Sequence, residues 1–164
     1  MERNLLSHPV KVAMTSPVIA ISPETSLEEA LRVMDVMCIR RLPVVDDGEL
    51  VGIISQRDVQ EALKDLEEHC EDGEPPGGRV ADSMVTEVFT ISPNAPIGRA
   101  AEIMLQEKIA ALPVMNSDGN LVGIITESDI FEVVVRLWKG EDPSVDAPDE
   151  DDYGMVTAEE LIVE

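Results

Sequence analysis

Two stretches of the chain carry the same pattern of apolar and polar positions. Leu42 to Val59 reads LPVVDDGELVGIISQRDV, and Leu112 to Ile130 reads LPVMNSDGNLVGIITESDI. In each stretch an Asp-Gly pair separates two runs rich in β-branched residues, which predicts two strands joined by a tight turn. The second run leads without a gap into apolar residues at helical spacing. The pattern therefore predicts a β-hairpin followed by a helix, twice.

The match between the two stretches extends over most of the chain. Met14 matches Met84, 70 residues on, and Asp58 matches Asp129, 71 residues on, because the second hairpin has one more residue. Each copy reads as a β-α-β-β-α unit whose sheet is too small to bury both faces alone. We therefore expect an α/β (α+β) fold in which two such motifs pack through their sheets by pseudo-twofold symmetry.

The first strands and the helices follow from local signals. Short strands are predicted at Val18–Ile21 and at Val88–Ile91. Ser26, with Glu29 three residues on, forms a capping box that predicts the first helix, and the matching helix runs from about 97 to 107. The inward faces expected for the helices after the hairpins are Val59, Ala62, Leu63 and Leu66 in the first copy, and Ile130, Val133, Val134 and Leu137 in the second.

Composition divides the chain into a first motif with an N-terminal lead-in (1–69), an acidic linker rich in Pro and Gly (70–79), a second motif (80–139) and an acidic tail (140–164). The stretch 141–152 carries seven acids and no base, which predicts a solvated tail. Thr157 and Glu160 are spaced to cap a short apolar turn at 161–163 that docks on this or another subunit.

The net charge of the chain makes two classes of binding partner unfavourable. The net charge is −22, from 34 acids against 12 bases, so the field of the protein repels nucleic acid and anionic membranes. Cys38 and Cys70 are expected to be free thiols in a reducing compartment, and MERNLLSHPVKV fits neither a signal peptide nor a membrane span. We expect a cytoplasmic protein that binds neither nucleic acid nor membrane.

The junction between hairpin and helix is the place where chemistry is expected. We call Ser55 to Asp58 the first corner and Thr126 to Asp129 the second corner. A hydroxyl followed three residues later by Asp is a plain capping box. The same oxygens lie beside unpaired backbone N–H groups at the positive end of a helix dipole, where they can also hold a ligand. Both interpretations stay open from the residues alone.

The doubled string G-I-I-[ST]-x-x-D, with L-P-V and a D-G turn before it, resembles a tandem pair of cystathionine-β-synthase (CBS) domains, also called a Bateman module. The resemblance covers about Val10 to Lys139. It implies two β-α-β-β-α units and two clefts between the paired sheets. It also implies binding of an adenosine-containing ligand, AMP, ADP, ATP or S-adenosylmethionine, in which the Asp accepts ribose hydroxyls and the Ser or Thr lies near ribose or phosphate.

The resemblance assigns site residues in both copies. In the second cleft they are Thr90, Ile91, Ala111, Leu112, Thr126 and Asp129; in the first they are Ile21, Arg41, Leu42, Ser55 and Asp58. Arg40 and Arg57 join the first set as bases that stand beside these positions in the sequence. The second set is the more complete, because Ala20 stands where the family often places a hydroxyl.

Charge differs between the two proposed clefts. Arg40 and Arg41 precede L-P-V in the first copy, and a guanidinium there can meet a phosphate bidentately, although surface solvation explains the pair equally well. The first corner holds Arg57 between its hydroxyl and its Asp, whereas the second corner holds Glu127 and Ser128 there. This acid disfavours an unassisted triphosphate and favours a monophosphate, a cationic sulfonium ligand or a nucleotide bridged by Mg²⁺.

The sequence predicts a regulatory ligand-binding module rather than an enzyme. No phosphate-binding loop, nucleophile elbow or paired general base is present, and His69-Cys70 lacks a second ligand pair at zinc spacing. No cofactor is required, and the regulated protein is unknown. The alternative is a structural adaptor whose nucleotide sites no longer function. The resemblance also implies a homodimer through helices, for which Val133, Val134 and Leu137 are candidates, with core packing as the rival explanation.

Overall fold

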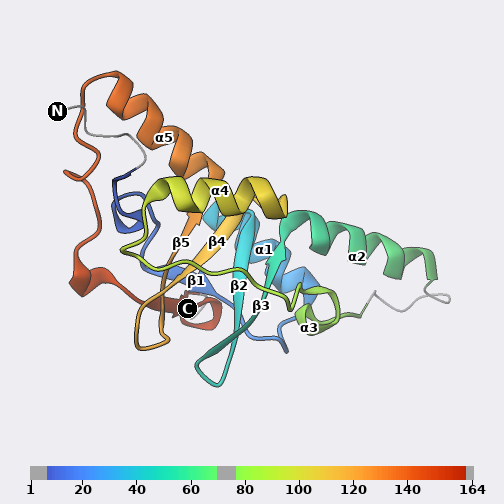
Figure 1. The fold of residues 1–164 in the computed structure, drawn as a ribbon. Coiled ribbons are helices and arrows are strands. Elements are labelled where there is room, and N and C mark those ends of the chain that lie inside the picture. The colour runs from blue at the N-terminus through green and yellow to red at the C-terminus, as the bar shows by residue number, and fades with distance from the viewer. Residues whose placement is uncertain (1–6, 70–76, 162–164) are drawn as a thin grey trace. The chain divides into compact units, whose positions relative to one another are not determined.

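The computed structural model describes residues 7–69 and 77–161 (Figure 1). Helices and strands alternate along these residues, which confirms the α+β class. The chain divides into two compact units, each with its own core. Unit 1 holds residues 7–18 with Phe89–Met155, and unit 2 holds Ile19–Val88 with residues 156–161, as far as these residues are described. The predicted packing of the two motifs through their sheets stays a prediction.

Unit 2 carries the first repeat. Its elements are α1 (Leu27–Met37), β2 (Arg41–Asp46), β3 (Glu49–Ser55), α2 (Gln56–His69) and α3 (Val80–Ser83). As predicted, the Ser26 hydroxyl caps α1 by accepting from the Glu29 N–H at 3.1 Å. Asp47 and Gly48 take positive φ in the turn between β2 and β3, as a tight turn of this kind requires. Of the face predicted for α2, Val59 is fully buried and Ala62, Leu63 and Leu66 pack against the core.

Unit 1 carries the second repeat on the same plan. Its elements are η2 (Val10–Val12), α4 (Ile97–Glu107), β4 (Ala111–Met115), β5 (Leu121–Thr126), α5 (Glu127–Trp138) and η3 (Glu150–Asp152). Both hairpins have the same register, with Pro43 opposite Ile53 and Pro113 opposite Ile124. On α5, Val133 is buried in the core, whereas Val134 is exposed. The inward placement predicted for Val134 is therefore wrong, because the core covers only one side of this helix.

Each hairpin is completed by the segment that precedes the other repeat. Thr15 exchanges backbone hydrogen bonds with Ile124 of β5 at 2.8 and 3.1 Å, and Val85 does the same with Ile53 of β3 at 2.9 and 3.0 Å. The segments are so close that only glycine fits opposite them. A Cβ on Gly123 would lie 2.9 Å from the Thr15 carbonyl oxygen, and one on Gly52 would lie 3.0 Å from that of Val85.

The two first strands differ from each other. β1 (Val18–Ala20) forms as predicted because β6 (Met155–Thr157) pairs with it. The strand predicted at Val88–Ile91 is wrong, since only a single bridge forms there, between Ile91 and Val114. Among the described residues no second strand lies beside residues 88–90, so their backbone has no ladder to join.

The acidic tail forms short elements, although most residues of 141–152 are exposed as the composition predicts. It passes through η3 and β6 into α6 (Ala158–Leu161), and Ala158 is buried in the core of unit 2. The Thr157 N–H donates to the Glu160 carboxylate at 3.2 Å, which is one half of the predicted cap. The rest of the apolar turn predicted at 161–163 lies outside the described residues, as do residues 70–76 of the predicted linker.

Candidate functional site

The second corner is held by three hydrogen bonds between Thr126 and Asp129. Asp129 Oδ2 accepts from the Thr126 N–H at 2.8 Å and from the Thr126 hydroxyl at 3.0 Å, and Thr126 Oγ1 accepts from the Asp129 N–H at 3.4 Å. Thr126 ends β5 and is the N-cap of α5, so strand and helix together fix both side chains. The corner is therefore a capping box, as one of the two interpretations of the sequence predicts.

The first corner repeats this geometry. Asp58 Oδ2 accepts from the Ser55 N–H at 2.9 Å, and Ser55 Oγ accepts from the Asp58 N–H at 3.1 Å. In both corners the capping bonds use only Oδ2 of the Asp. Within the described part of the chain, no hydrogen bond reaches Oδ1 of Asp58 or of Asp129. The capping role therefore leaves each carboxylate an oxygen that can accept from a ligand.

Asp129 lies in partly desolvated surroundings. Burial raises the pKa of its carboxyl above the ordinary value of 3.8, and Glu132, one turn further on, raises the pKa as well. The hydrogen bonds from Thr126 act in the opposite direction but do not outweigh burial. Perturbed carboxylates of this kind concentrate at functional sites, although structural networks also produce them.

A pocket of about 260 Å³ opens beside Asp129 within unit 1. Its walls are residues 12–15 of the N-terminal segment, then Asp129, Glu132, Val133 and Arg136 of α5, and finally Pro143, Asp146 and Pro148 of the tail. Among the described residues that line it, Arg136 is the only base. The pocket therefore combines a hydroxyl at Thr15, carboxylates at one end and a guanidinium two helical turns further on.

The hairpins bring some of the other predicted residues to the corners. Arg41 is the strand partner of Ser55, and Ala111 is the strand partner of Thr126. Directly opposite residues on paired strands project from the same face, so the first copy has a base beside its hydroxyl where the second has a methyl group. Ala111 itself is buried.

The remaining predicted residues fall into two groups. Ile21, Leu42, Ile91 and Leu112 are buried in the two cores. Thr90 and Arg40 are exposed, and Arg57 is turned along α2 to pair with Glu61 at 3.1 Å. The structure thus joins the polar corner residues within each unit but does not bring Thr90, Arg40 or Arg57 into hydrogen bonds with them.

Arg136 and the tail residues of the pocket were missed by the sequence argument. A comparison of the two helices after the hairpins would have found Arg136, because it stands seven residues after Asp129 where the first copy has Asp65 seven residues after Asp58. No comparable signal exists for Pro143, Asp146 and Pro148, since the tail has no counterpart in the first repeat.

Two other kinds of feature are absent from the residues that the structure describes. None of the helices there combines the length and the apolar character that a membrane crossing needs. In the same residues, no group of three or more His, Cys, Asp or Glu side chains is arranged to hold a metal ion.

Known proteins resemble this chain in both sequence and structure. The model of the CBS domain family matches residues 10–65 and 79–136. A CBS domain-containing protein of Dictyostelium discoideum is 33% identical over 139 residues, which cover 82% of this chain and 96% of that protein. Inosine-5'-monophosphate dehydrogenase of Thermoplasma acidophilum is 41% identical over 114 residues, 70% of this chain but only 21% of the dehydrogenase.

Solved structures give the same result. The CBS domain pair of protein MJ0100, in complex with 5'-methylthioadenosine and S-adenosyl-L-methionine, is 28% identical with a TM-score of 0.66, covering 81% of this chain and 97% of that one. CBSX2 in complex with AMP is 26% identical with a TM-score of 0.65, covering 80% and 98%. Since both repeats match the family model and whole CBS pairs match the fold, the chain belongs to the CBS domain family, of which it carries two copies.

Proposed function

We propose that the chain is a non-catalytic regulatory module that binds an adenosine-containing ligand and reports its presence to a partner protein. The observation that carries this proposal is Asp129, a partly buried carboxylate fixed by Thr126, with one oxygen left over, on the wall of a pocket. Support comes from the similar CBS pairs whose structures hold S-adenosyl-L-methionine, 5'-methylthioadenosine or AMP.

The chemistry of the second corner suits a ribose. A carboxylate that accepts two neighbouring hydroxyls makes charge-assisted hydrogen bonds, which are about twice as strong as neutral ones. Thr126 keeps the carboxylate in place through its own N–H and hydroxyl, so little reorganisation is needed when a sugar binds. The buried Ala111 across the hairpin adds an apolar surface of the kind that lines small-molecule sites.

The charges restrict the ligand. Asp129, Glu132 and the exposed Glu127 all lie on the first two turns of α5, so a triphosphate is expected to need Mg²⁺ in order to bind there. A monophosphate or S-adenosylmethionine needs no metal. The first corner, with Arg41 opposite Ser55, is proposed as a second site that accepts a phosphate more readily.

Ligand binding can be tested by thermal unfolding. A ligand that binds only the folded state stabilises it by about 2.7 kcal/mol at one hundred times its Kd. AMP, ADP, S-adenosylmethionine, and ATP with and without Mg²⁺ are therefore added to the full chain. We expect at least one of them to raise Tm, and Asp129→Ala to abolish the increase.

The matched control is Glu127→Ala, which removes one acid from the same turn of α5 without touching the capping box. It should keep the ligand effect. Asp58→Ala removes the equivalent group of the first corner and shows how much of the response comes from unit 2. A Tm that no ligand changes, or that Asp129→Ala leaves fully responsive, contradicts the proposal.

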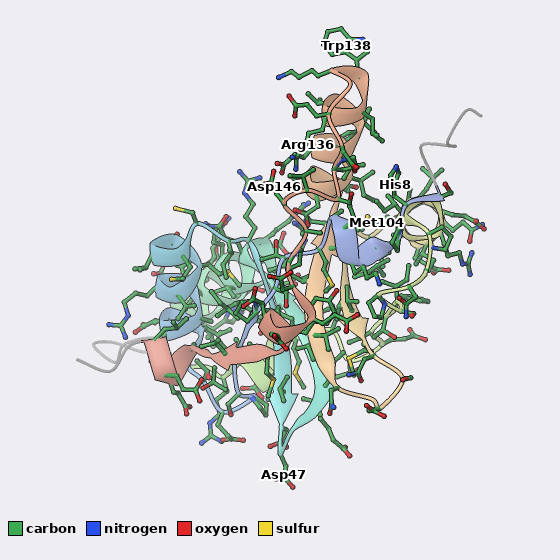
Figure 2. All side chains as sticks on the ribbon, turned by 90° about the vertical axis from the view of Figure 1, so that its left-hand side faces the viewer. His8, Asp47, Met104, Arg136, Trp138 and Asp146 are labelled. Atoms are coloured by element: carbon green, nitrogen blue, oxygen red, sulfur yellow. The ribbon has the colours of Figure 1, made fainter. Side chains whose placement is uncertain are left out.

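We also propose that the chain forms a homodimer through α5. Phe131, Val134, Val135 and Trp138 recur at i, i+3, i+4 and i+7, and they are 67%, 42%, 47% and 83% exposed. This spacing makes one continuous apolar face turned away from the core. Figure 2 shows Trp138 projecting from the end of the helix. Phe131→Ser with Trp138→Ser is expected to halve the mass seen by sedimentation, with Glu127→Ser as a control.

The same face supports the alternative of a structural adaptor, because large exposed apolar patches mark protein interaction sites. The adaptor differs from the sensor in that no adenosyl ligand changes Tm while the dimer, or a complex with another protein, still forms. We propose a cytoplasmic location for either function, and fractionation of cells that make the protein tests it.

A further inference from the structure

The tail passes over the pocket of unit 1 as a strap, which we define as residues 141–148. One end continues from α5, where the Glu141 N–H donates to the Arg136 carbonyl oxygen at 2.9 Å. The other end is fixed by the N-terminal segment: the Ser16 hydroxyl donates to the Asp152 carbonyl oxygen at 3.1 Å, and the Val18 N–H donates to that of Gly154 at 3.0 Å. The strap is therefore anchored on both sides of the pocket.

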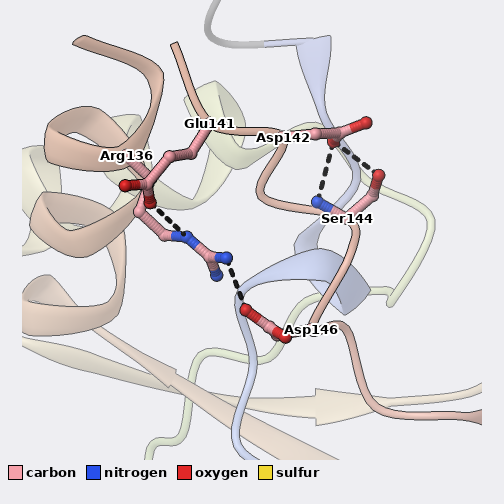
Figure 3. A network of polar contacts seen from close by, with 5 residues as sticks. All are labelled: Arg136, Glu141, Asp142, Ser144 and Asp146. Atoms are coloured by element: carbon pink, nitrogen blue, oxygen red, sulfur yellow. Dashed lines mark hydrogen bonds and ion pairs between the residues drawn. The ribbon is translucent and has the colours of Figure 1, made fainter. Parts of the chain in front are cut away.

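The strap makes a turn at Asp142–Ser144, beside the pocket. Asp142 Oδ1 accepts from the Ser144 N–H at 3.0 Å and from the Ser144 hydroxyl at 2.6 Å, a local turn of the kind that Asp side chains stabilise (Figure 3). The turn buries Pro143 between its two exposed neighbours. Pro143 and Pro148 line the pocket, so the apolar parts of the strap face inward.

Two of the three carboxylates of the strap, Glu141 and Asp146, contact Arg136. Nη2 of the guanidinium donates a hydrogen bond to Asp146, and Glu141 lies 3.5 Å from Nε (Figure 3). Only 22% of the Arg136 side chain is exposed, against 52% of Glu141 and 71% of Asp146. The base thus belongs to the pocket, and the two acids reach it from solvent. The hydrogen bond that the guanidinium donates to Asp146 is the main cause that raises the pKa of Arg136 above its ordinary value.

Asp129 and Arg136 are arranged as the two ends of one site. They lie seven residues apart on the same face of α5, about 10 Å along the helix axis. Both residues line the pocket of unit 1, so a ligand in it can reach both. The volume of about 260 Å³ is below the range of about 300–1,000 Å³ for whole ligand sites. Such a space suits the charged end of a ligand whose ribose is held by Asp129.

We propose that Arg136 recognises the anionic end of the ligand, and that the strap carboxylates of Glu141 and Asp146 occupy this place as an internal competitor when no ligand is bound. The proposal rests on the proposed function and adds the chemical class of the ligand, an adenosyl compound that ends in a phosphate or a carboxylate. AMP supplies the phosphate, and the amino-acid end of S-adenosylmethionine supplies the carboxylate.

Competition at Arg136 gives the sensor a way to report occupancy. A guanidinium can bind one phosphate or carboxylate bidentately, so the single anion of the ligand can take the place of both strap acids. The released strap then changes its exposure to solvent. Adenosine and 5'-methylthioadenosine carry no anion, so they leave the strap on Arg136 and bind without releasing it.

The test measures ligand affinity by calorimetry on the full chain and on Glu141→Gln with Asp146→Asn. Partly exposed ion pairs of this kind each shift an equilibrium by about two- to fivefold. The double variant is therefore expected to bind AMP and S-adenosylmethionine about five- to tenfold more tightly. The affinities for adenosine and 5'-methylthioadenosine are expected to change less than twofold. Comparing the phosphate with the carboxylate shows which anion Arg136 prefers.

Two further variants separate competition from general charge effects. Asp149→Asn with Asp151→Asn removes the same charge from the same tail but leaves both partners of Arg136 in place, so no affinity should change. Arg136→Gln should release the strap without any ligand, which hydrogen exchange of the amides at 141–148 detects. It should also reduce the affinity for AMP to that for adenosine.

The outcomes distinguish this inference from the proposed function. If AMP binds the wild type and the Glu141→Gln, Asp146→Asn variant equally, or if all four ligands gain alike, competition at Arg136 is refuted while adenosyl binding stands. If none of the four ligands binds any variant, both proposals are refuted. In AMP-bound wild type, faster exchange at 141–148 supports the inference, and unchanged exchange contradicts it.

Discussion

The two units hold pockets of similar volume that differ in whether a base lines them. In unit 1 the pocket of about 260 Å³ contains Arg136, whereas in unit 2 a pocket of about 250 Å³ is lined by Asp65 and Asp82. Asp65 occupies the place of Arg136 on the matching helix. Among the described residues that line the pocket of unit 2 there is no base, so of these two pockets only that of unit 1 offers a guanidinium to an anion.

The comparison shows that the repeats share their framework and differ in where they place a base. In unit 2 a base, Arg41, is the strand partner of Ser55, whereas in unit 1 Ala111 stands at that place and the base of the pocket is Arg136 on the helix. Duplication therefore preserved the backbone and the capping box, and changes of single side chains made the two corners chemically different. The two sites need not accept the same ligand.

The largest loss of stability is expected at the two glycines where a neighbouring segment lies closest to each hairpin. Gly123→Ala would place a Cβ 2.7 Å from Met14 Sδ and 2.9 Å from the Thr15 carbonyl oxygen, and Gly52→Ala would meet Met84 and Val85 in the same way. Each is expected to lower the free energy of unfolding by about 1–3 kcal/mol, as overpacking does, in chemical denaturation. Equal losses confirm that the units are built alike; a neutral substitution in either unit contradicts the close approach.

The next effect tests the difference in charge. Arg136→Asp gives unit 1 the residue that unit 2 has at this position. We expect the affinity for AMP to fall at least about tenfold, since a favourable bidentate contact becomes a repulsion, with the affinity for adenosine changed much less. Calorimetry on both ligands measures this. Equal losses for AMP and adenosine would show that the substitution damages the pocket rather than anion recognition.

The capping boxes should contribute equally in the two units. Ser55→Ala and Thr126→Ala each remove a side chain that accepts from the backbone at the start of a helix. Each is expected to destabilise the fold by about 1 kcal/mol in denaturant titrations, the usual cost of a lost N-cap. A much larger loss for Thr126→Ala would mean that its hydroxyl bond to Asp129 does more than cap the helix.

The smallest effect concerns pH. Because burial raises the pKa of Asp129 above 3.8, the folded protein keeps this proton at pH values where the unfolded chain has lost it. Stability contributed by the protonated form is therefore lost as the pH rises through the raised pKa. Asp129→Asn does not ionise, so its Tm relative to the wild type should increase as the pH is raised from below 3.8 to neutral. A relative Tm that falls over this range contradicts the assignment.

Local sequence signals predicted the secondary structure correctly where the stabilising contacts join residues that are close in sequence. The hairpins, the Ser26 cap and the helix at Ile97–Glu107 depend on contacts within a few residues, and they were predicted correctly. The strand expected at 88–91 failed because a strand needs a neighbour, and residues near Val18 have one in β6 whereas residues 88–90 have none in the described part. The outward turn of Val134 likewise depends on how much of α5 the core covers.

The sequence alone determined the two-copy plan, the capping boxes and the candidate carboxylates, because repetition and short-range spacing are properties of the chain. Only the tertiary structure decided that each hairpin is completed by the segment before the other repeat, and that an acidic tail lies on Arg136. These contacts join residues far apart in sequence, where no periodicity links the partners. Side-chain packing and charge pairing in the folded chain determine which of these distant segments contact each other, and composition does not.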